Sequence, residues 1–268
     1  ISKMSGEKLD FNSALNQAQD SGFAESDPTN DVDGFDAAYK LAIMASLAFD
    51  TRVRVEDVYR EGISALERQD FIYAEDLGYT VKLLAMARYD NETLSVRVHP
   101  ALIPQTHLLS KVDGVFNAIE IEGDLIGQVL FHGQGAGPMP TSSAVIGDIL
   151  EIARNIVSGV GPVTGVGRSF NKELVFLPIE DLNTKYYIRV KVGDQAGVMA
   201  QISRVFGDLD ISIAGVIQKN ADSVNETAEI VIITHLSKEE RIREAVSQLS
   251  MASVVKQISN VIRVEECV

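Results

Sequence analysis

The sequence contains a single cysteine, Cys267, only four histidines, and no apolar run long enough to cross a bilayer. One thiol forms neither an internal disulfide nor a cysteine metal cluster, so we expect a reducing compartment, the cytoplasm. The histidines are far apart and lack zinc-motif spacing, so no metal site is expected. No signal peptide is visible, and the chain begins with Ile1 instead of methionine, so we expect a longer natural chain.

Basic residues are also scarce: 24 lysines and arginines face 38 acidic residues, for a net charge of −14. A negative surface repels phosphate backbones and anionic headgroups, so neither nucleic acid nor a membrane is an expected partner. The composition, 46% hydrophobic and 23% charged, is typical of a globular protein with a sizeable core. The length of 268 residues suffices for two domains.

Hydrophobic periodicity divides the chain in two. The first part predicts helices at 7–20, 35–49 and 141–156, the second of them apolar on most faces and therefore buried, and hairpins at 81–98 and 117–132. The last part has the order βαββαβ, a ferredoxin-like unit that could fold alone. The predicted fold class is α+β, an antiparallel sheet covered by helices followed by the ferredoxin-like unit. The predicted domains are residues 1–165 and 185–268. The linker between them, 166–184, overlaps the glycine-rich stretch 158–173.

The stretch from Glu25 to Lys40, here called the acidic segment, carries five carboxylates within twelve residues. Asp36 and Lys40 are four residues apart on the predicted helix 35–49 and share a face. A lysine buried near carboxylates is held protonated and can donate a proton to a developing alkoxide. Glu25 and Asp31 could bind a substrate ammonium group. A second interpretation stays open, in which Asp33 simply caps the helix. A calcium-binding loop is excluded, because Lys40 would occupy the twelfth position of the loop, where glutamate is required.

Two glycine-containing turns could present backbone amides to an anion. The run from Gly133 to Gly137 follows a strand and opens a helix, but Pro138 stands where a dinucleotide fingerprint needs its third glycine. A plain turn is the default interpretation there, with a cofactor edge as the alternative. At the first turn of the C-terminal unit, which contains Asp194 and Gly197, the backbone amides could meet a carboxylate, or the turn could bind nothing.

The acidic segment resembles the signature region of homoserine dehydrogenases. The matching residues are Gly22-Phe23-Ala24-Glu25-Ser26-Asp27-Pro28 and then Asp31-x-x-Gly34-x-Asp36-x-x-x-Lys40. The resemblance implies that Lys40 is the proton donor and acceptor at the hydroxyl or aldehyde carbon. It implies that Glu25, Asp31 and Asp36 bind homoserine or hold the lysine. Phe23 replaces the family's usual tyrosine, so no hydroxyl contact is carried over from that position.

The run from Gly133 to Thr141 resembles the family's GxGAGxxPT segment, which implies that Gly137 contacts the nicotinamide cofactor. The C-terminal unit resembles an ACT domain, an amino-acid-sensing module, although Ala196 replaces the usual proline. That resemblance implies feedback control by threonine, with Asp194, Gly197 and Val198 as candidate allosteric residues. It also implies pairing between subunits, as a homodimer or homotetramer.

The resemblance therefore predicts a homoserine dehydrogenase, an oxidoreductase that interconverts L-homoserine and L-aspartate 4-semialdehyde in threonine, methionine and isoleucine biosynthesis. Its cofactor, NAD(P), is expected to bind mainly to an N-terminal domain that these residues lack, so the fragment alone should be inactive. The alternative is a non-catalytic amino-acid-sensing regulatory protein whose working part is the ACT-like unit. A third hypothesis gives that unit a role in dimerisation alone.

Overall fold

The computed structural model describes residues 1–135, 137–159, 170–222 and 226–266. The first part of the chain, residues 1–135, is called the N-terminal unit. Its helices are α1 (Ser2–Gly6), α2 (Phe11–Asp20), α3 (Thr29–Val32), α4 (Phe35–Phe49) and α5 (Arg68–Asp76), with short 3₁₀ turns η1 (Val55–Asp57) and η2 (Leu108–Lys111). Its strands are β1 (Tyr59–Arg60), β2 (Tyr79–Asp90), β3 (Thr93–Pro104), β4 (Phe116–Gly123) and β5 (Gly127–Gln134).

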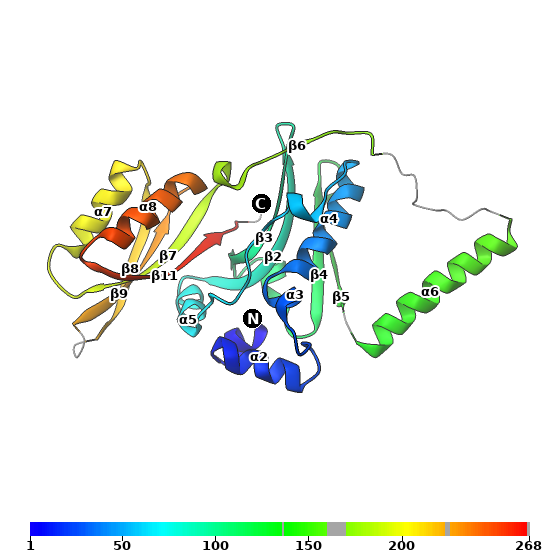
Figure 1. The fold of residues 1–268 in the computed structure, drawn as a ribbon, viewed down its shortest axis with the longest axis horizontal. Helices are drawn as coiled ribbons and strands as arrows, with labels where there is room; N and C mark the ends of the chain where they lie inside the picture. The colour runs from blue at the N-terminus through cyan, green and yellow to red at the C-terminus, as the bar shows by residue number, and fades with distance from the viewer. Residues whose placement is uncertain (136, 160–169, 223–225, 267–268) are drawn as a thin grey trace.

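Strands β2 and β3, each of twelve residues, form the long antiparallel hairpin of the N-terminal unit (Figure 1). The turn consists of Asn91 and Glu92, both with positive φ, a geometry that matches the twist of a two-residue hairpin. Helix α4 lies against this hairpin and buries Ala38, Leu41 and Ala45. The predicted helix 35–49 is confirmed, but its predicted burial is wrong for one face, where the exposed side chains are Tyr39, Ile43 and Leu47.

The C-terminal unit, Asn183–Val264, has the predicted βαββαβ order, and its elements are β7 (Asn183–Gly193), α7 (Val198–Asp208), β8 (Ile213–Asp222), β9 (Thr227–Thr234), β10 (Ser237–Lys238), α8 (Glu239–Met251) and β11 (Val255–Val264). The sheet order β11-β7-β9-β8 is that of a ferredoxin-like unit, so the α+β fold class is confirmed. Val198, Ile202 and Phe206 on α7 pack against Val190 and Ile230 of the sheet.

The two units share one nine-stranded sheet, which the sequence did not predict. The end of β11 pairs in parallel with β3, with Arg263 opposite Ala101 and Val264 opposite Leu102. A common core on one face of this sheet joins residues from both units, among them Phe71, Leu102 and Tyr187. The predicted linker falls partly on residues 160–169, which lie outside the described residues. The short strand β6 (Val175–Phe176) and the turn η3 (Ile179–Asp181) follow these residues and lead into β7.

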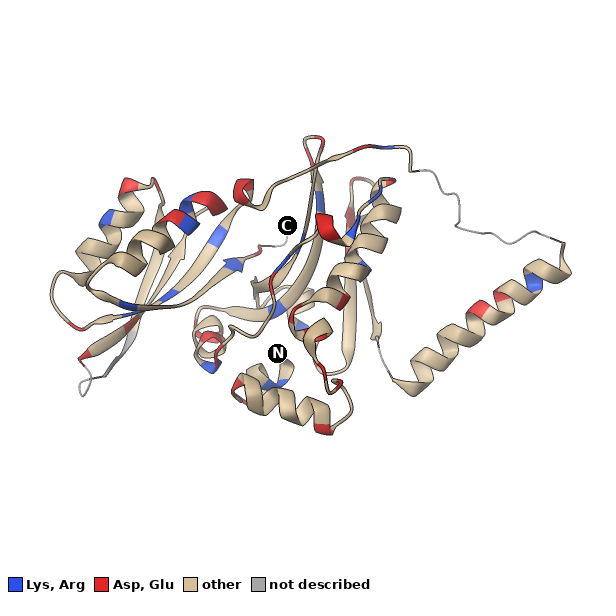
Figure 2. Cartoon of the chain, in the orientation of Figure 1, with Lys and Arg blue, Asp and Glu red and all other residues tan. Residues whose placement is uncertain are grey.

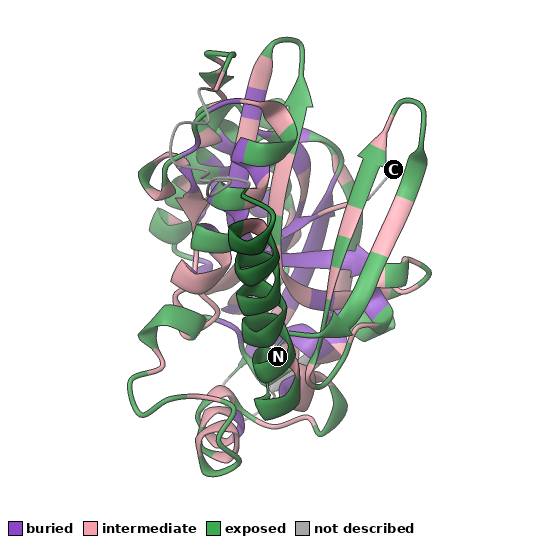
Figure 3. Ribbon diagram, turned by 90° about the vertical axis from the view of Figure 1, so that its right-hand side faces the viewer, coloured by how far each residue is buried: buried purple, intermediate pink, exposed green. Residues whose placement is uncertain are grey.

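Helix α6 (Pro138–Val157) extends away from the rest of the chain (Figure 1). Apart from Pro140 and Asn155, its residues are exposed along its whole length, as Figure 3 shows. The exposed residues include Ile149, Ile152 and Ile156, so an apolar stripe faces solvent. Within the described residues, even this 20-residue helix lacks the combination of length and hydropathy needed to span a bilayer.

Candidate functional site

The acidic segment lies on the surface and runs from the end of α2 through α3 to the start of α4, where Figure 2 shows acidic residues in succession. Glu25 is exposed in the loop after α2, and its carbonyl accepts a hydrogen bond of 2.9 Å from the Gln19 side-chain amide. Asp31 is exposed on α3. The carboxylates of both residues are therefore accessible to a ligand from outside the chain.

Asp36 and Lys40 lie one turn apart on α4, and Lys40 Nζ is 2.5 Å from Asp36 Oδ2. The shared face predicted from their spacing is confirmed. The expected burial of the lysine is wrong: the Lys40 side chain is 66% exposed and that of Asp36 is 47% exposed. An exposed pair of this kind adds little to stability, because solvent screens the attraction. The carboxylate nevertheless contacts the ammonium group on the exposed face of α4.

Asp33 does not cap α4. The N-cap is Gly34, in the left-handed conformation at φ 76°, and it makes no side-chain capping bond. Asp33 instead ends α3, and its N–H donates to the Thr29 carbonyl. The prediction failed because two helices meet at this point, and the turn between them needs the positive φ that glycine adopts without strain.

Asp27, just before α3, hydrogen-bonds to Thr29 at the start of that helix, a structural role that sequence reasoning missed. Its Oδ1 accepts the Thr29 hydroxyl at 2.6 Å and the Thr29 backbone N–H at 3.1 Å. These hydrogen bonds, with that from the hydroxyl contributing most, lower the pKa of Asp27. The pattern Asp-x-Thr before a short helix was the available signal. Asp27 thus orders the loop between Glu25 and Asp31.

Gly137 is the N-cap of α6, with φ 123° and ψ 159°, a conformation open essentially to glycine alone. Pro138 and Pro140 have no N–H, and the Thr141 N–H donates to the Gly137 carbonyl, so among residues 138–141 only the Met139 amide could meet a ligand. The neighbouring strands β4 and β5 are antiparallel, so a parallel βαβ cradle for a dinucleotide is absent from this part of the structure. The residues present fit contact with one edge of NAD(P) and do not fit holding the whole cofactor.

The candidate allosteric residues lie together at the start of α7. Asp194 is exposed, and its N–H donates to the Glu226 carbonyl. Gly197 is the N-cap of α7 in the left-handed conformation, φ 90°, again without a side-chain capping bond. Val198 is only 4% exposed and belongs to the core of the C-terminal unit. Its side chain therefore serves packing, and only its backbone is placed to meet a ligand.

A segment that sequence reasoning missed packs directly against the acidic segment. This is Tyr59–Ile63, called the bridging segment below. The Arg60 guanidinium lies 3.4 Å from the centre of the Phe35 ring and donates a hydrogen bond to the Asp33 carbonyl. No local sequence pattern predicts these contacts, because they join residues more than twenty positions apart. Among the described residues, no group of three potential ligands could hold a metal ion.

The fold and the site together define a two-part protein: an α+β unit bearing an exposed lysine paired with a carboxylate, and a ferredoxin-like βαββαβ unit. The sequence model of the homoserine dehydrogenase family matches residues 1–150, and that of the ACT domain matches residues 186–250. The chain therefore belongs to the homoserine dehydrogenase family, and its C-terminal unit contains an ACT domain.

Individual relatives agree with this assignment. Homoserine dehydrogenase from Neisseria gonorrhoeae is 38% identical over 99% of this chain and 61% of its own length. The enzyme of the same name from Mycobacterium tuberculosis is 41% identical over 99% and 61%. The crystal structure of a homoserine dehydrogenase from Thiobacillus denitrificans superposes with a TM-score of 0.89 at 36% identity, covering 99% of this chain and 61% of that one. The chain thus spans about three fifths of the length of these relatives.

Proposed function

We propose that this chain is the substrate-binding and regulatory part of a homoserine dehydrogenase, which interconverts L-homoserine and L-aspartate 4-semialdehyde. The observation that carries the proposal is the Asp36–Lys40 pair, exposed on α4 in the same surface segment as the exposed residues Glu25 and Asp31. Family membership supports it, because these four residues occupy the positions of the family's signature.

The chemistry follows from the charges. An α-amino acid brings an ammonium group, which the carboxylates of Glu25 and Asp31 attract. The Lys40 ammonium, held by Asp36, lies where it can give a proton to the alkoxide oxygen formed in the reduction of the aldehyde. In the reverse direction the neutral amine takes the hydroxyl proton. A nicotinamide cofactor, when bound, supplies the hydride chemistry.

NAD(P) is proposed to contact this chain at Gly137 and to be held mainly by a part of the family chain outside these 268 residues. The glycine-only backbone conformation of Gly137 and the Met139 amide at the start of α6 support such a contact. The choice between NAD and NADP is assigned to that other part, because specificity depends on groups around the adenine ribose.

We also propose, from the same family membership, where the enzyme acts, how it assembles and which effector it binds. The enzyme would act in the cytoplasm, in threonine, methionine and isoleucine biosynthesis, as a homodimer or homotetramer. L-threonine is the proposed effector, bound at the turn of Asp194, Gly197 and the Val198 backbone. Residues 1–165 form the proposed catalytic domain, 166–184 the linker and 185–268 the regulatory domain.

The test is the Lys40→Ala variant in the full-length enzyme that carries this chain, assayed for homoserine-dependent formation of NAD(P)H. We expect turnover to fall by at least about a thousandfold, while thermal unfolding is unchanged because the side chain is exposed. Arg204→Ala is the matched control, since Arg204 forms an exposed i,i+4 pair with Asp208 on α7. Full activity of Lys40→Ala, or an equal loss in both variants, would refute the assignment.

A further inference from the structure

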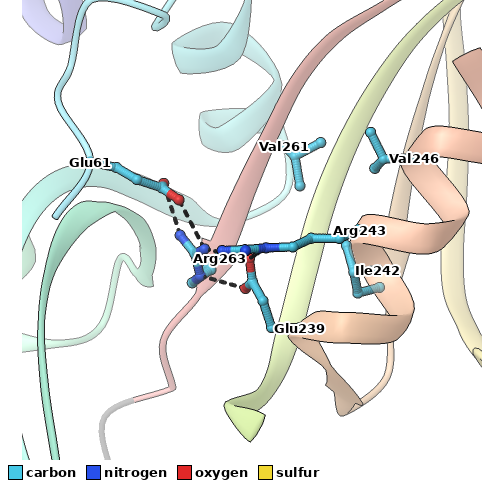
Figure 4. A pocket seen from close by; sticks show the side chains of 7 residues that line it. All are labelled: Glu61, Glu239, Ile242, Arg243, Val246, Val261 and Arg263. Carbon is cyan, nitrogen blue, oxygen red and sulfur yellow. Dashed lines mark hydrogen bonds and ion pairs between the residues drawn. The ribbon is translucent and has the colours of Figure 1, made fainter. Parts of the chain in front are cut away.

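The bridging segment Tyr59–Ile63 is held from both sides, by the C-terminal unit and by the acidic segment. From one side, Arg263 on β11 donates two hydrogen bonds to the Glu61 carboxylate, one from each terminal nitrogen and each 2.9 Å long (Figure 4). On the other side, the Ile63 N–H donates to the Val32 carbonyl at 2.8 Å. One short segment therefore touches both the last strand of the ACT-containing unit and α3, the short helix that carries Asp31.

Two glycines bring the backbones of these segments close together. A Cβ placed on Gly62 would lie 2.7 Å from the Val32 carbonyl oxygen and 2.9 Å from Asp33 Cα, so only glycine fits there. A Cβ on Gly34 would lie 3.2 Å from a Val98 methyl group and 3.6 Å from the Glu61 carbonyl oxygen. Because backbone meets backbone without a flexible side chain between them, a displacement of the bridging segment must displace the acidic segment as well.

The Glu61–Arg263 pair has one buried partner, Arg263, whereas the Glu61 side chain is 37% exposed. Arg263 is 4% exposed, and its guanidinium also pairs with Glu239 of α8 at 2.7 Å. Burial alone would raise the pKa of Glu61, but the hydrogen bonds and charge of Arg263 outweigh it and hold that pKa below its ordinary value. The carboxylate therefore stays ionised at neutral pH. Glu61 lines a cavity of about 360 Å³ whose other lining residues all belong to the C-terminal unit, so this carboxylate reaches that unit's surface.

We propose that Glu61 is a positioning residue: by holding Arg263 of the C-terminal unit, it fixes the bridging segment against the acidic segment and so sets the geometry of Asp31. The regulatory unit thereby acts on substrate binding through direct contact, without a change in the catalytic lysine. The link to substrate rests on the function proposed above. The mechanical link between Glu61 and the acidic segment does not.

The mechanical link is tested on the 268-residue chain by amide hydrogen exchange in the Glu61→Gln variant. We expect exchange to rise about tenfold in peptides covering 29–36 and 62–66, where the Ile63 N–H reports the contact with Val32 directly. Glu67→Gln is the matched control, because Glu67 pairs with Arg189, another buried arginine of the C-terminal unit, at 2.7 Å and lies outside the bridging segment. Equal exchange in these peptides in both variants would overturn the proposal.

The link to substrate is tested by steady-state kinetics of the full-length enzyme. We expect Glu61→Gln to raise KM for homoserine about tenfold with kcat within about twofold, and Glu67→Gln to change neither. Gly62→Ala, which disturbs the acidic side of the contact and leaves Arg263 untouched, should give the same split if Glu61→Gln does not fold. An unchanged KM, or a loss in kcat alone, would overturn this part. An inactive wild type would instead refute the proposed function and leave the exchange result standing.

Discussion

Arg189 of β7 and Asp70 of α5 form a fully buried ion pair between the two units, with Arg189 Nε 2.8 Å from Asp70 Oδ1. Asp70 has no exposed surface, and Arg189 is 2% exposed. The same carboxylate accepts hydrogen bonds from the Tyr187 hydroxyl, the Asn260 side chain and the Glu67 backbone. A buried charge is tolerated when every lone pair is satisfied in this way. The pair therefore fixes how the C-terminal unit sits on the N-terminal unit.

Asp70→Asn should lower the free energy of unfolding by roughly 3 kcal/mol, because it leaves part of a buried cation uncompensated. The asparagine side-chain N–H₂ would also face Tyr187, Arg189 and Asn260, which are themselves donors at this position. Urea unfolding at pH 7.5 measures the loss. Asp113→Asn is the control: Asp113 pairs with Lys82 at 2.8 Å but its side chain is 66% exposed, so a change under about 0.5 kcal/mol is expected. Similar losses in the two variants would contradict the structural role of Asp70.

His99 is the group whose titration should govern stability at mildly acid pH. It has no exposed surface, Nδ1 donates to the Pro100 carbonyl, and Nε2 lies 3.7 Å from a carboxylate oxygen of Glu265. Burial, together with the charges of Arg263 and Arg97, lowers the pKa of His99 to about 3, although Glu61 acts in the opposite direction. The folded chain therefore keeps this ring neutral at a pH where the unfolded chain protonates it.

The number of protons bound at His99 in the folded and unfolded states decides how stability changes with pH. Between about pH 6.5 and pH 3 the unfolded state binds one more proton at His99, so stability falls as pH falls. From pH 7.5 to pH 5 this group alone should cost about 2 kcal/mol. His99→Gln should remove that part of the slope, measured by urea unfolding at both pH values. Comparing slopes cancels any constant loss of packing in the variant, and equal slopes in variant and wild type would show that His99 does not titrate as described.

The features predicted correctly from sequence are those whose cause is local. Helix 35–49 and both hairpins follow from periodicities contained within each segment, and the βαββαβ order follows in the same way. The Asp36–Lys40 contact needs only helical spacing. The pairing of β3 with β11 and the Arg189–Asp70 bond join residues more than a hundred positions apart, and no pattern in either segment encodes the partner. The predicted burial of α4 was wrong for one face for a similar reason, because an apolar helix face does not indicate which neighbouring element covers it.

Gly137→Ala should strain the start of α6, because an alanine at φ 123° and ψ 159° costs about 1–3 kcal/mol. We expect faster exchange of the Thr141 amide, which donates to the Gly137 carbonyl, and in the full-length enzyme a higher KM for NAD(P). Gly147→Ala in the same helix is the control. Gly147 lacks a positive φ and has open space around its Cβ position, so alanine should stabilise the helix by about 1 kcal/mol. An unchanged KM in Gly137→Ala would remove Gly137 from the cofactor contact.

L-threonine should bind at the start of α7, where the uncapped amides after Gly197 can meet its carboxylate and the exposed Asp194 carboxylate can meet its ammonium group. Titration calorimetry on the 268-residue chain measures this directly. Asp194→Asn should weaken binding about tenfold, because one charge-assisted hydrogen bond is replaced by a neutral one. Asp208→Asn, which removes an exposed carboxylate at the other end of α7, should leave the affinity unchanged. Absence of heat with the wild type, or equal weakening by both variants, would exclude this turn as the threonine site, because Asp194 lies three residues before Gly197 and Asp208 lies at the other end of α7.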